Sequence, residues 1–119
     1  MAKADGRNTR FELSEYRGVW LFAMFDLPVT TPVARRRYTQ FRTLLLKLGF
    51  EMMQFSVYAR YFPSEAATKS YRKRIRGGLP ANGHVRLLMI TDKQFGKMQV
   101  FHGKTEESPE QPPDQMLLF

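Results

Sequence analysis

The stretch VWLFAMFDLP, residues 19–28, decides the fold of this chain. Its first seven residues are apolar on both faces and rich in aromatic rings, which predicts a central β-strand covered on both sides. The run is too short to cross a bilayer. Pro28 ends the strand because proline cannot donate a hydrogen bond to the ladder.

Two later segments have the periodicity of amphipathic helices. The first begins at Thr31, a typical N-cap, has Pro32 at its first position and stops at Gly49. Its predicted core-facing stripe consists of Ala34, Tyr38, Phe41, Leu45 and Leu48. The second helix is predicted over residues 65–75, with Ser64 as its cap. Its inward stripe consists of Ala67, Tyr71 and Ile75.

The remaining ordered segments are predicted to be extended. Residues 52–62 alternate between two faces, of which the apolar one is expected to pack on the helices. The apolar face consists of Met53, Phe55, Val57, Ala59 and Tyr61, and the mixed face of Gln54, Ser56, Tyr58 and Arg60. Residues 84–91 form another strand, and a further short strand is predicted over residues 96–101.

This order of strands and helices predicts a mixed α/β sandwich with both helices on one sheet face. The opposite face of the first strand is also apolar, through Trp20, Phe22 and Met24. Two helices cannot cover both faces of a small sheet. We therefore expect a homodimer in which a second copy stacks sheet on sheet.

The 119 residues suffice for one compact domain, predicted over residues 18–102. A polar N-terminal extension covers residues 1–17, and an acidic, proline-rich linker covers residues 103–119. The linker ends in an apolar tetrapeptide that either folds back on its own sheet edge or adds a strand to a partner: Met116, Leu117, Leu118 and Phe119. The chain has no Cys and no visible secretion signal, so we expect a cytoplasmic protein without a membrane partner.

The charge is concentrated in one part of the chain. Residues 35–76 hold eleven Lys or Arg against Glu51 and Glu65, within a net charge of +8. A surface of this kind either solubilises the protein or binds the phosphates of a nucleic acid. The cations follow helical spacing and do not alternate with exposed aromatics, which favours double-stranded over single-stranded partners. The candidate nucleic-acid ligands are Arg35, Arg36, Arg37, Arg42, Arg60, Lys69, Arg72, Lys73 and Arg76.

Asp26 is the candidate for metal chemistry. It ends the first strand in phase with Phe22 and Met24, so a dimer through that face brings two copies of Asp26 together. Facing carboxylates share a proton or bind a cation, and Mg²⁺ often needs only one or two of them to act on a phosphodiester. The alternative is that Asp26 caps the turn before Pro28.

Several motifs resemble the small CRISPR-associated adaptation protein family, "Cas-two", the lesser partner of the spacer integrase. The motifs are FDLP at residues 25–28, RRRY at 35–38, FR at 41–42, LGF at 48–50 and MQFSVYAR at 53–60. The resemblance covers residues 18–101. The FDLP and MQFSVYAR motifs are similar to those of family members that accompany Cas-nine.

The resemblance implies a ferredoxin-like βαββαβ fold, α+β in class, with residues 51–62 broken into two strands. It implies a homodimer with Asp26 as the Mg²⁺-linked residue at the interface. Residues Ser56 and Tyr58, and those at 35–37, match positions tied to nuclease activity in some members.

In function, the resemblance implies spacer acquisition in antiviral defence. The dimer would hold double-stranded DNA and bridge two integrase dimers, with residues 116–119 as the pairing strand. Members are often named Mg²⁺-dependent endoribonucleases or deoxyribonucleases, so a stand-alone, toxin-like ribonuclease is one alternative. A general RNA-binding module is the other.

Overall fold

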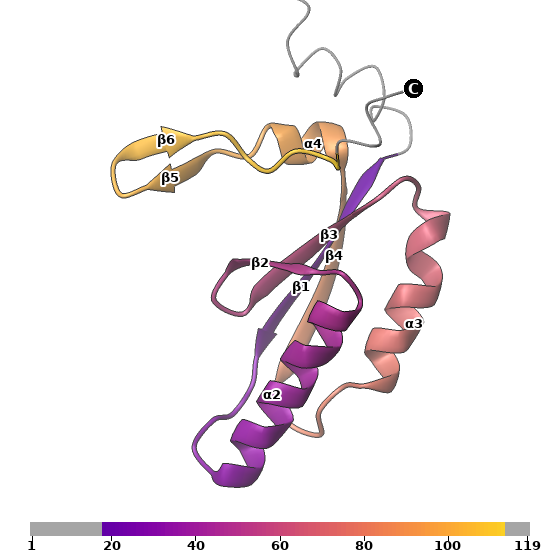
Figure 1. Ribbon diagram of the computed structural model, residues 1–119, viewed down its shortest axis with the longest axis vertical. Coiled ribbons are helices and arrows are strands. Elements are labelled where there is room, and N and C mark those ends of the chain that lie inside the picture. The colour runs from indigo at the N-terminus through magenta and orange to yellow at the C-terminus, as the bar shows by residue number, and fades with distance from the viewer. Residues whose placement is uncertain (1–17, 114–119) are drawn as a thin grey trace, which may run out of the picture. The chain divides into compact units, whose positions relative to one another are not determined.

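The computed structural model describes residues 18–113 (Figure 1). The described chain divides into two compact units. One consists of residues 21–60 and 66–89, and the other of residues 18–20, 61–65 and 90–113. Within residues 18–113, no helix combines the length and the apolar character needed to span a membrane.

The main sheet has four strands in the order β2-β3-β1-β4. The strands of this sheet and the helices between them are, in chain order, β1 (Val19–Asp26), α2 (Pro32–Lys47), β2 (Glu51–Gln54), β3 (Val57–Phe62), a 3₁₀ turn (Ala66–Thr68), α3 (Lys69–Gly77) and β4 (His84–Thr91). This is the βαββαβ order of a ferredoxin-like α+β fold, as the resemblance implies. Strand β4 has the predicted bounds.

Both helices cover the same face of the sheet (Figure 1). From β1, Phe25 packs edge-on against Phe41 of α2, with ring centroids 5.2 Å apart. Leu21 of β1 lines a hollow together with Ile75 of α3. Alternate residues of a strand point to the same side, so Leu21 and Phe25 face one layer that contains both helices.

Helix α2 begins and ends as predicted. The Thr31 hydroxyl accepts a hydrogen bond from the Ala34 backbone N–H at 3.0 Å, and Gly49 follows the helix with a φ of 85°. Of the predicted stripe, Phe41, Leu45 and Leu48 are buried, whereas Ala34 and Tyr38 are half-buried.

The predicted start of the second helix was wrong. A 3₁₀ turn at Ala66–Thr68 precedes α3, which begins only at Lys69. Thr68 holds the N-cap position without capping. Its hydroxyl is engaged elsewhere, since it accepts from the Arg72 guanidinium at 3.1 Å.

Residues 51–62 form two antiparallel strands, as the resemblance implies. The predicted assignment of their faces was wrong. Tyr58 stacks on Phe25 with centroids 5.6 Å apart, and Arg60 lies 4.5 Å over the ring of Tyr71 in α3. The mixed face therefore packs on the helices, and Ala59, which is also buried, points to the other side of the sheet.

The second unit contains elements that the sequence analysis missed. Helix α4 (Asp92–Gly96) takes the first residue of the strand predicted at 96–101, and only the end of that segment is extended, as β5 (Val100–His102). Strand β5 pairs with β6 (Thr105–Glu107), which lies inside the predicted linker. A capping box starts α4: Thr91 accepts from the Gln94 backbone N–H, and the Gln94 side chain accepts from the Thr91 N–H.

Trp20 belongs to this second unit, and its ring is buried within the chain. Its ring stacks on Phe95 of α4 at 3.9 Å, and its indole N–H donates to the buried Asp92 carboxylate at 2.7 Å. Helix α4 of the same chain thus covers a ring that the sequence analysis assigned to a partner.

Candidate nucleic-acid interface

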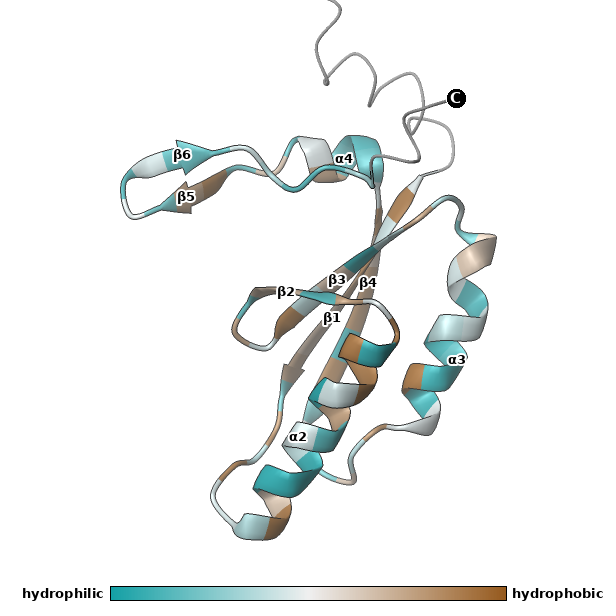
Figure 2. Cartoon of the chain, in the orientation of Figure 1, coloured by the Kyte–Doolittle hydropathy of each residue, from teal (hydrophilic) through white to brown (hydrophobic). Residues whose placement is uncertain are grey.

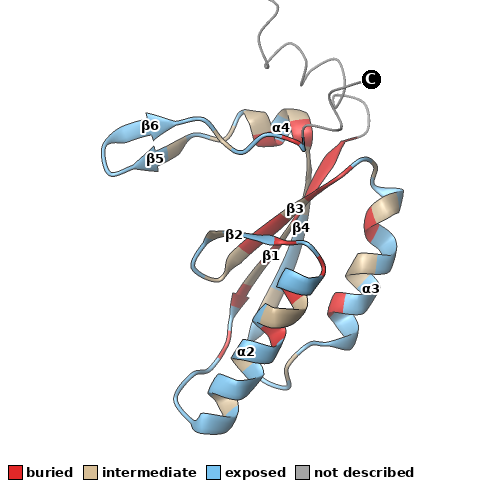
Figure 3. Cartoon of the chain, viewed as in Figure 1, coloured by how far each residue is buried: buried red, intermediate tan, exposed pale blue. Residues whose placement is uncertain are grey.

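Four of the predicted cationic ligands lie on the outer side of α2. Arg35, Arg36, Arg37 and Arg42 are all exposed, whereas the buried residues of the helix face the sheet (Figure 3). Arg35 donates to the Val29 carbonyl at 3.2 Å, which fixes one guanidinium near the start of the helix. Amphipathic periodicity produces this arrangement, because the apolar stripe leaves the arginines only the solvent side.

Helix α3 continues the charge on the same side of the sheet. Lys69, Lys73 and Arg76 are exposed, and Arg72 is half-buried beside Thr68. These four cations line an open hollow of about 670 Å³. Hydrophilic residues follow the outer side of both helices (Figure 2). We call the predicted cations of α2 and α3 together the cationic helix surface.

Arg60 lies apart from that surface. Its guanidinium donates to the Leu48 carbonyl at 2.9 Å, just after α2, and covers the ring of Tyr71 in α3. This contact lowers the pKa of Tyr71, since the hydrogen bond and the positive charge of Arg60 favour the phenolate. From β3, Arg60 thus contacts both the end of α2 and the ring of Tyr71 in α3. Its position in a basic stretch of sequence did not indicate this role in packing.

Asp26 and Ser56 lie near each other at the end of β1. The Phe25 backbone N–H donates to the Ser56 carbonyl at 3.1 Å, and the Asp26 side chain is exposed. Gly83 comes so close that a Cβ there would lie 2.5 Å from the Asp26 carbonyl oxygen. Tyr58, by contrast, is only 1% exposed and its ring is part of the core.

Asp26 does not belong to a cluster of metal-ligating side chains in the described part of the chain. Among residues 18–113, no group of three or more His, Cys, Asp or Glu side chains could hold a metal ion. An exposed carboxylate still suits Mg²⁺, which keeps several waters and binds one or two carboxylates.

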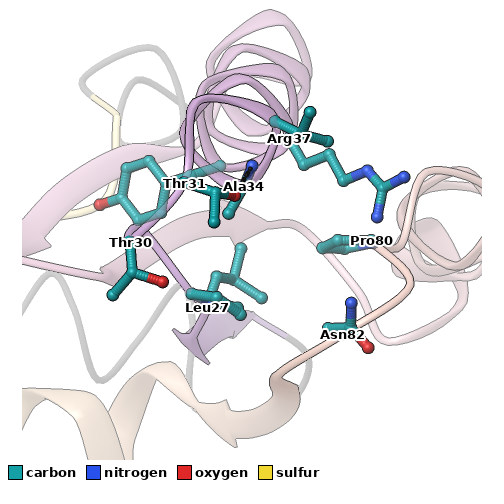
Figure 4. Close-up of a pocket in the computed structure, with 10 residues that line it drawn as sticks. Leu27, Thr30, Thr31, Ala34, Arg37, Pro80 and Asn82 are labelled. Carbon is teal, nitrogen blue, oxygen red and sulfur yellow. Dashed lines mark hydrogen bonds between the residues drawn. The ribbon is translucent and has the colours of Figure 1, made fainter.

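A hollow of about 240 Å³ adjoins the start of α2. It is lined by Leu27 after β1, by Thr31 and Arg37 of the helix region, and by Pro80 and Asn82 before β4. Figure 4 shows Arg37 extending from the helix toward the loop of Pro80 and Asn82. Sequence reasoning missed this hollow, because its two sides are far apart along the chain. The predicted partner-binding residues 116–119 lie outside the described residues.

Comparisons with known proteins place this geometry in a family. Residues 19–98 match the family described as CRISPR associated protein Cas2. A CRISPR-associated endoribonuclease Cas2 of Parvibaculum lavamentivorans is 48% identical over 101 residues, covering 85% of this chain and 100% of that protein. The protein of that name from Flavobacterium psychrophilum is 42% identical, covering 90% and 93%, and one from Streptococcus mutans is 36% identical, covering 74% and 82%. The chain, with its βαββαβ sheet and arginine-bearing helices, belongs to the Cas2 family.

Proposed function

We propose that this protein is the DNA-holding subunit of CRISPR spacer acquisition. The observation that supports this most directly is the cationic helix surface, in which two helices on one sheet face direct their cations to solvent. Arginine and lysine at helical spacing contact phosphates without reading bases. A double-stranded segment of any sequence can therefore be held, as a protein that captures new spacers requires.

The proposed active form is a homodimer bound to the integrase. On the sheet face opposite the helices, Phe22 and Met24 are half-buried and Leu88 is 47% exposed in the single chain. A second copy covering this face would place one cationic helix surface on each outer side of the pair. Residues 116–119 are proposed to pair with the integrase, and co-purification of the full chain and of a chain ending at residue 115 tests that pairing.

A second candidate function is Mg²⁺-dependent cleavage of phosphodiesters, favoured by the name endoribonuclease that the relatives carry. Asp26 of each copy would hold the ion, and Ser56 lies beside the same end of β1. When bound, Mg²⁺ activates water and neutralises phosphate charge. The part of this chain is to position a carboxylate at the exposed end of β1.

Charge reversal tests the DNA-holding function. We expect Arg36→Glu with Arg37→Glu to abolish duplex binding. The corresponding Ala variants should lower the salt dependence of log Kd by about one for each phosphate-binding side chain removed. The matched control is Lys97→Glu with Lys104→Glu, which changes the net charge equally at exposed positions outside the two helices. Equal weakening by both pairs would refute a specific role for the cationic helix surface.

Asp26→Asn separates the two functions. Duplex affinity should stay within about two-fold of the original, because no phosphate ligand is removed. Cleavage of RNA or DNA in the presence of Mg²⁺ should be lost. If the purified protein cuts nothing, or if the variant cuts equally well, the nuclease candidate fails and the holding function stands.

A further inference from the structure

We propose that a groove between α2 and the loop after α3 binds residues 114–119 of this protein until the integrase takes them up. The proposed function pairs residues 116–119 with the integrase, so the inference rests on that function and adds a resting site for the same segment. It follows from three observations: a groove with apolar walls, a single guanidinium within it, and an acidic and apolar segment whose spacing matches both.

Two hollows that share Arg37 and Pro80 form this groove. The one of about 240 Å³ lies beside the start of α2, and the one of about 420 Å³ continues along the helix to Leu44. The opposite wall is the loop of residues 78–82, which lies directly against the helix, because a Cβ at Gly78 would overlap the Leu44 side chain. Both walls of the groove thus belong to the same compact unit.

Apolar side chains in these walls remain accessible. Val33 at the start of α2 and Leu79 in the loop are each 47% exposed, and Leu44 is half-buried. Val33, Arg37 and Leu44 follow one another at spacings of four and seven residues, so they share one side of the helix. A segment that covers these side chains would remove apolar surface from water, which favours binding.

Arg37 decides what kind of segment fits. Among the described residues that line the two hollows, it alone carries a charge, and its side chain extends from α2 toward Pro80 and Asn82 (Figure 4). An entirely apolar partner would desolvate the guanidinium without pairing it. A chain of phosphates would leave the apolar walls uncovered. The groove therefore suits a protein segment that combines one acidic residue with apolar side chains.

Residues 114–119, which lie outside the described part of the chain, have this composition. Their sequence is DQMLLF, in which an acidic residue is followed, from the third position on, by four apolar ones. When such a segment binds in an extended conformation, Asp114, Met116 and Leu118 share one face, because alternate residues point to the same side. One face thus presents a carboxylate and two apolar side chains in line.

The spacing of that face matches the groove. From Asp114 to Leu118 an extended segment spans about 13 Å, and from Arg37 to Leu44 the helix rises about 10 Å. With its carboxylate on the guanidinium, the segment brings its apolar side chains over Leu44 and Leu79. Such a contact is weak alone, but a segment of the same protein binds at an effective concentration of about millimolar. An integrase that binds the segment more tightly would displace it.

Disulfide trapping tests this contact in the full chain, which has no cysteine of its own. Leu79→Cys is combined with Leu118→Cys, and mass spectrometry identifies the disulfide formed under mild oxidation. Leu46→Cys with Leu118→Cys is the matched control, because Leu46 is 42% exposed but lies about 200° around α2 from Leu44. Each rate is divided by the rate at which the cysteine at position 79 or 46 reacts with glutathione disulfide. We expect the first pair to form at least about 10-fold faster.

Two further variants make the test independent of one position. Ala81→Cys with Leu118→Cys uses another exposed residue of the same hollow and should trap the segment as well, even if Leu79→Cys disturbs the loop. Asp114→Arg, added to the pair at 79 and 118, should slow trapping about 2-fold to 5-fold, because it places a like charge beside Arg37. Mixing chains of natural and heavy nitrogen shows whether the disulfide joins one chain or two, and either linkage places the segment in the groove.

The outcomes distinguish this inference from the proposed function. Equal corrected rates for the pairs at 79 and 46 would overturn the resting site, and so would trapping that appears only after the integrase is added. Co-purification with the integrase and duplex affinity are measured separately and could still support the proposed function. If the segment is trapped but the full chain neither binds the integrase nor holds duplex DNA, the proposed function fails and the groove remains its binding site.

Discussion

Arg60 shows that position in a basic sequence does not decide what a cation does. It lies in the same charged stretch as the arginines of α2, yet it donates to the Leu48 carbonyl and covers the ring of Tyr71. A guanidinium can bind a carbonyl and stack on a ring at the same time, which an ammonium cannot do equally well. Its first effect is therefore on packing and on the titration of Tyr71.

Replacing Arg60 should raise the pKa of Tyr71. In Arg60→Gln we expect the pKa of Tyr71 to return toward its ordinary value of 10.0, because the main hydrogen bond and charge that favour the phenolate are removed. The phenolate absorbance of the full chain during an alkaline titration measures it, with Tyr71→Phe identifying the signal. Arg74→Gln is the matched control and should raise this pKa less, since Arg74 is the weaker cause. A larger rise in Arg74→Gln would contradict this account.

Because the pKa of Tyr71 is lowered in the folded chain, this residue stabilises the fold at alkaline pH. The pKa of Tyr71 is lower in the folded than in the unfolded chain, so the folded chain releases the proton first. Its contribution to stability is present above the unfolded pKa and is lost as the pH falls through the lower, folded value. Arg60→Gln should flatten this alkaline rise in the free energy of unfolding, and an unchanged slope would count against the contact.

At the scale of elements, the hydroxyl of Thr31 sets the start of α2. It accepts from the Ala34 N–H at 3.0 Å, and no acidic residue supports the first turn. We expect Thr31→Ala to lower the free energy of unfolding by about 1 kcal/mol, because an N-cap is removed. Thr39→Ala, the same change at an exposed position within α2, should be neutral or slightly stabilising. Urea unfolding measures both, and equal effects would show that Thr31 does not act as a cap.

The sequence predicted those elements whose signals are local and strong. Strand β1 is a continuous apolar run, and α2 combines a Thr-Pro start, a regular stripe and a glycine stop. Helix α4 was missed although its Thr91 and Gln94 form a capping box, because five residues carry no helical periodicity. The faces of β3 were assigned wrongly, since both of its faces are largely buried and the charged Arg60 packs on the helix side through Tyr71 and the Leu48 carbonyl.

The candidate site was predictable to a similar extent. Helical spacing placed the arginines of α2 on the solvent side, where the structure has them. Neither the engagement of Arg60 nor the stack of Phe55 on Tyr38 could be predicted, because each joins elements whose relative position only the fold determines. Local patterns thus indicate which residues face solvent, and tertiary contacts decide which of these remain accessible to a ligand.

At the scale of the whole molecule, the proposed dimer depends on the sheet face opposite the helices. Leu88 lies on that face, since its neighbours Leu87 and Met89 line a hollow with Ile75 of α3. On β1, Phe22 and Met24 share the face, because Leu21 and Phe25 point to the helices. These apolar side chains are contiguous with the strand that ends at Asp26, so pairing through them would bring the two carboxylates together.

Leu88→Glu should therefore abolish the dimer. Two-fold symmetry places one new carboxylate from each copy in an apolar interface, and we expect the dimer Kd to rise at least about 100-fold. Leu46→Glu is the matched control, because Leu46 is 42% exposed, comparable with the 47% of Leu88, but lies on α2. Sedimentation velocity of the full chain reports the oligomeric state, and duplex affinity should fall with the dimer. If Leu88→Glu stays dimeric, or if Leu46→Glu dissociates the pair instead, the two copies meet through another surface and Asp26 loses its proposed counterpart.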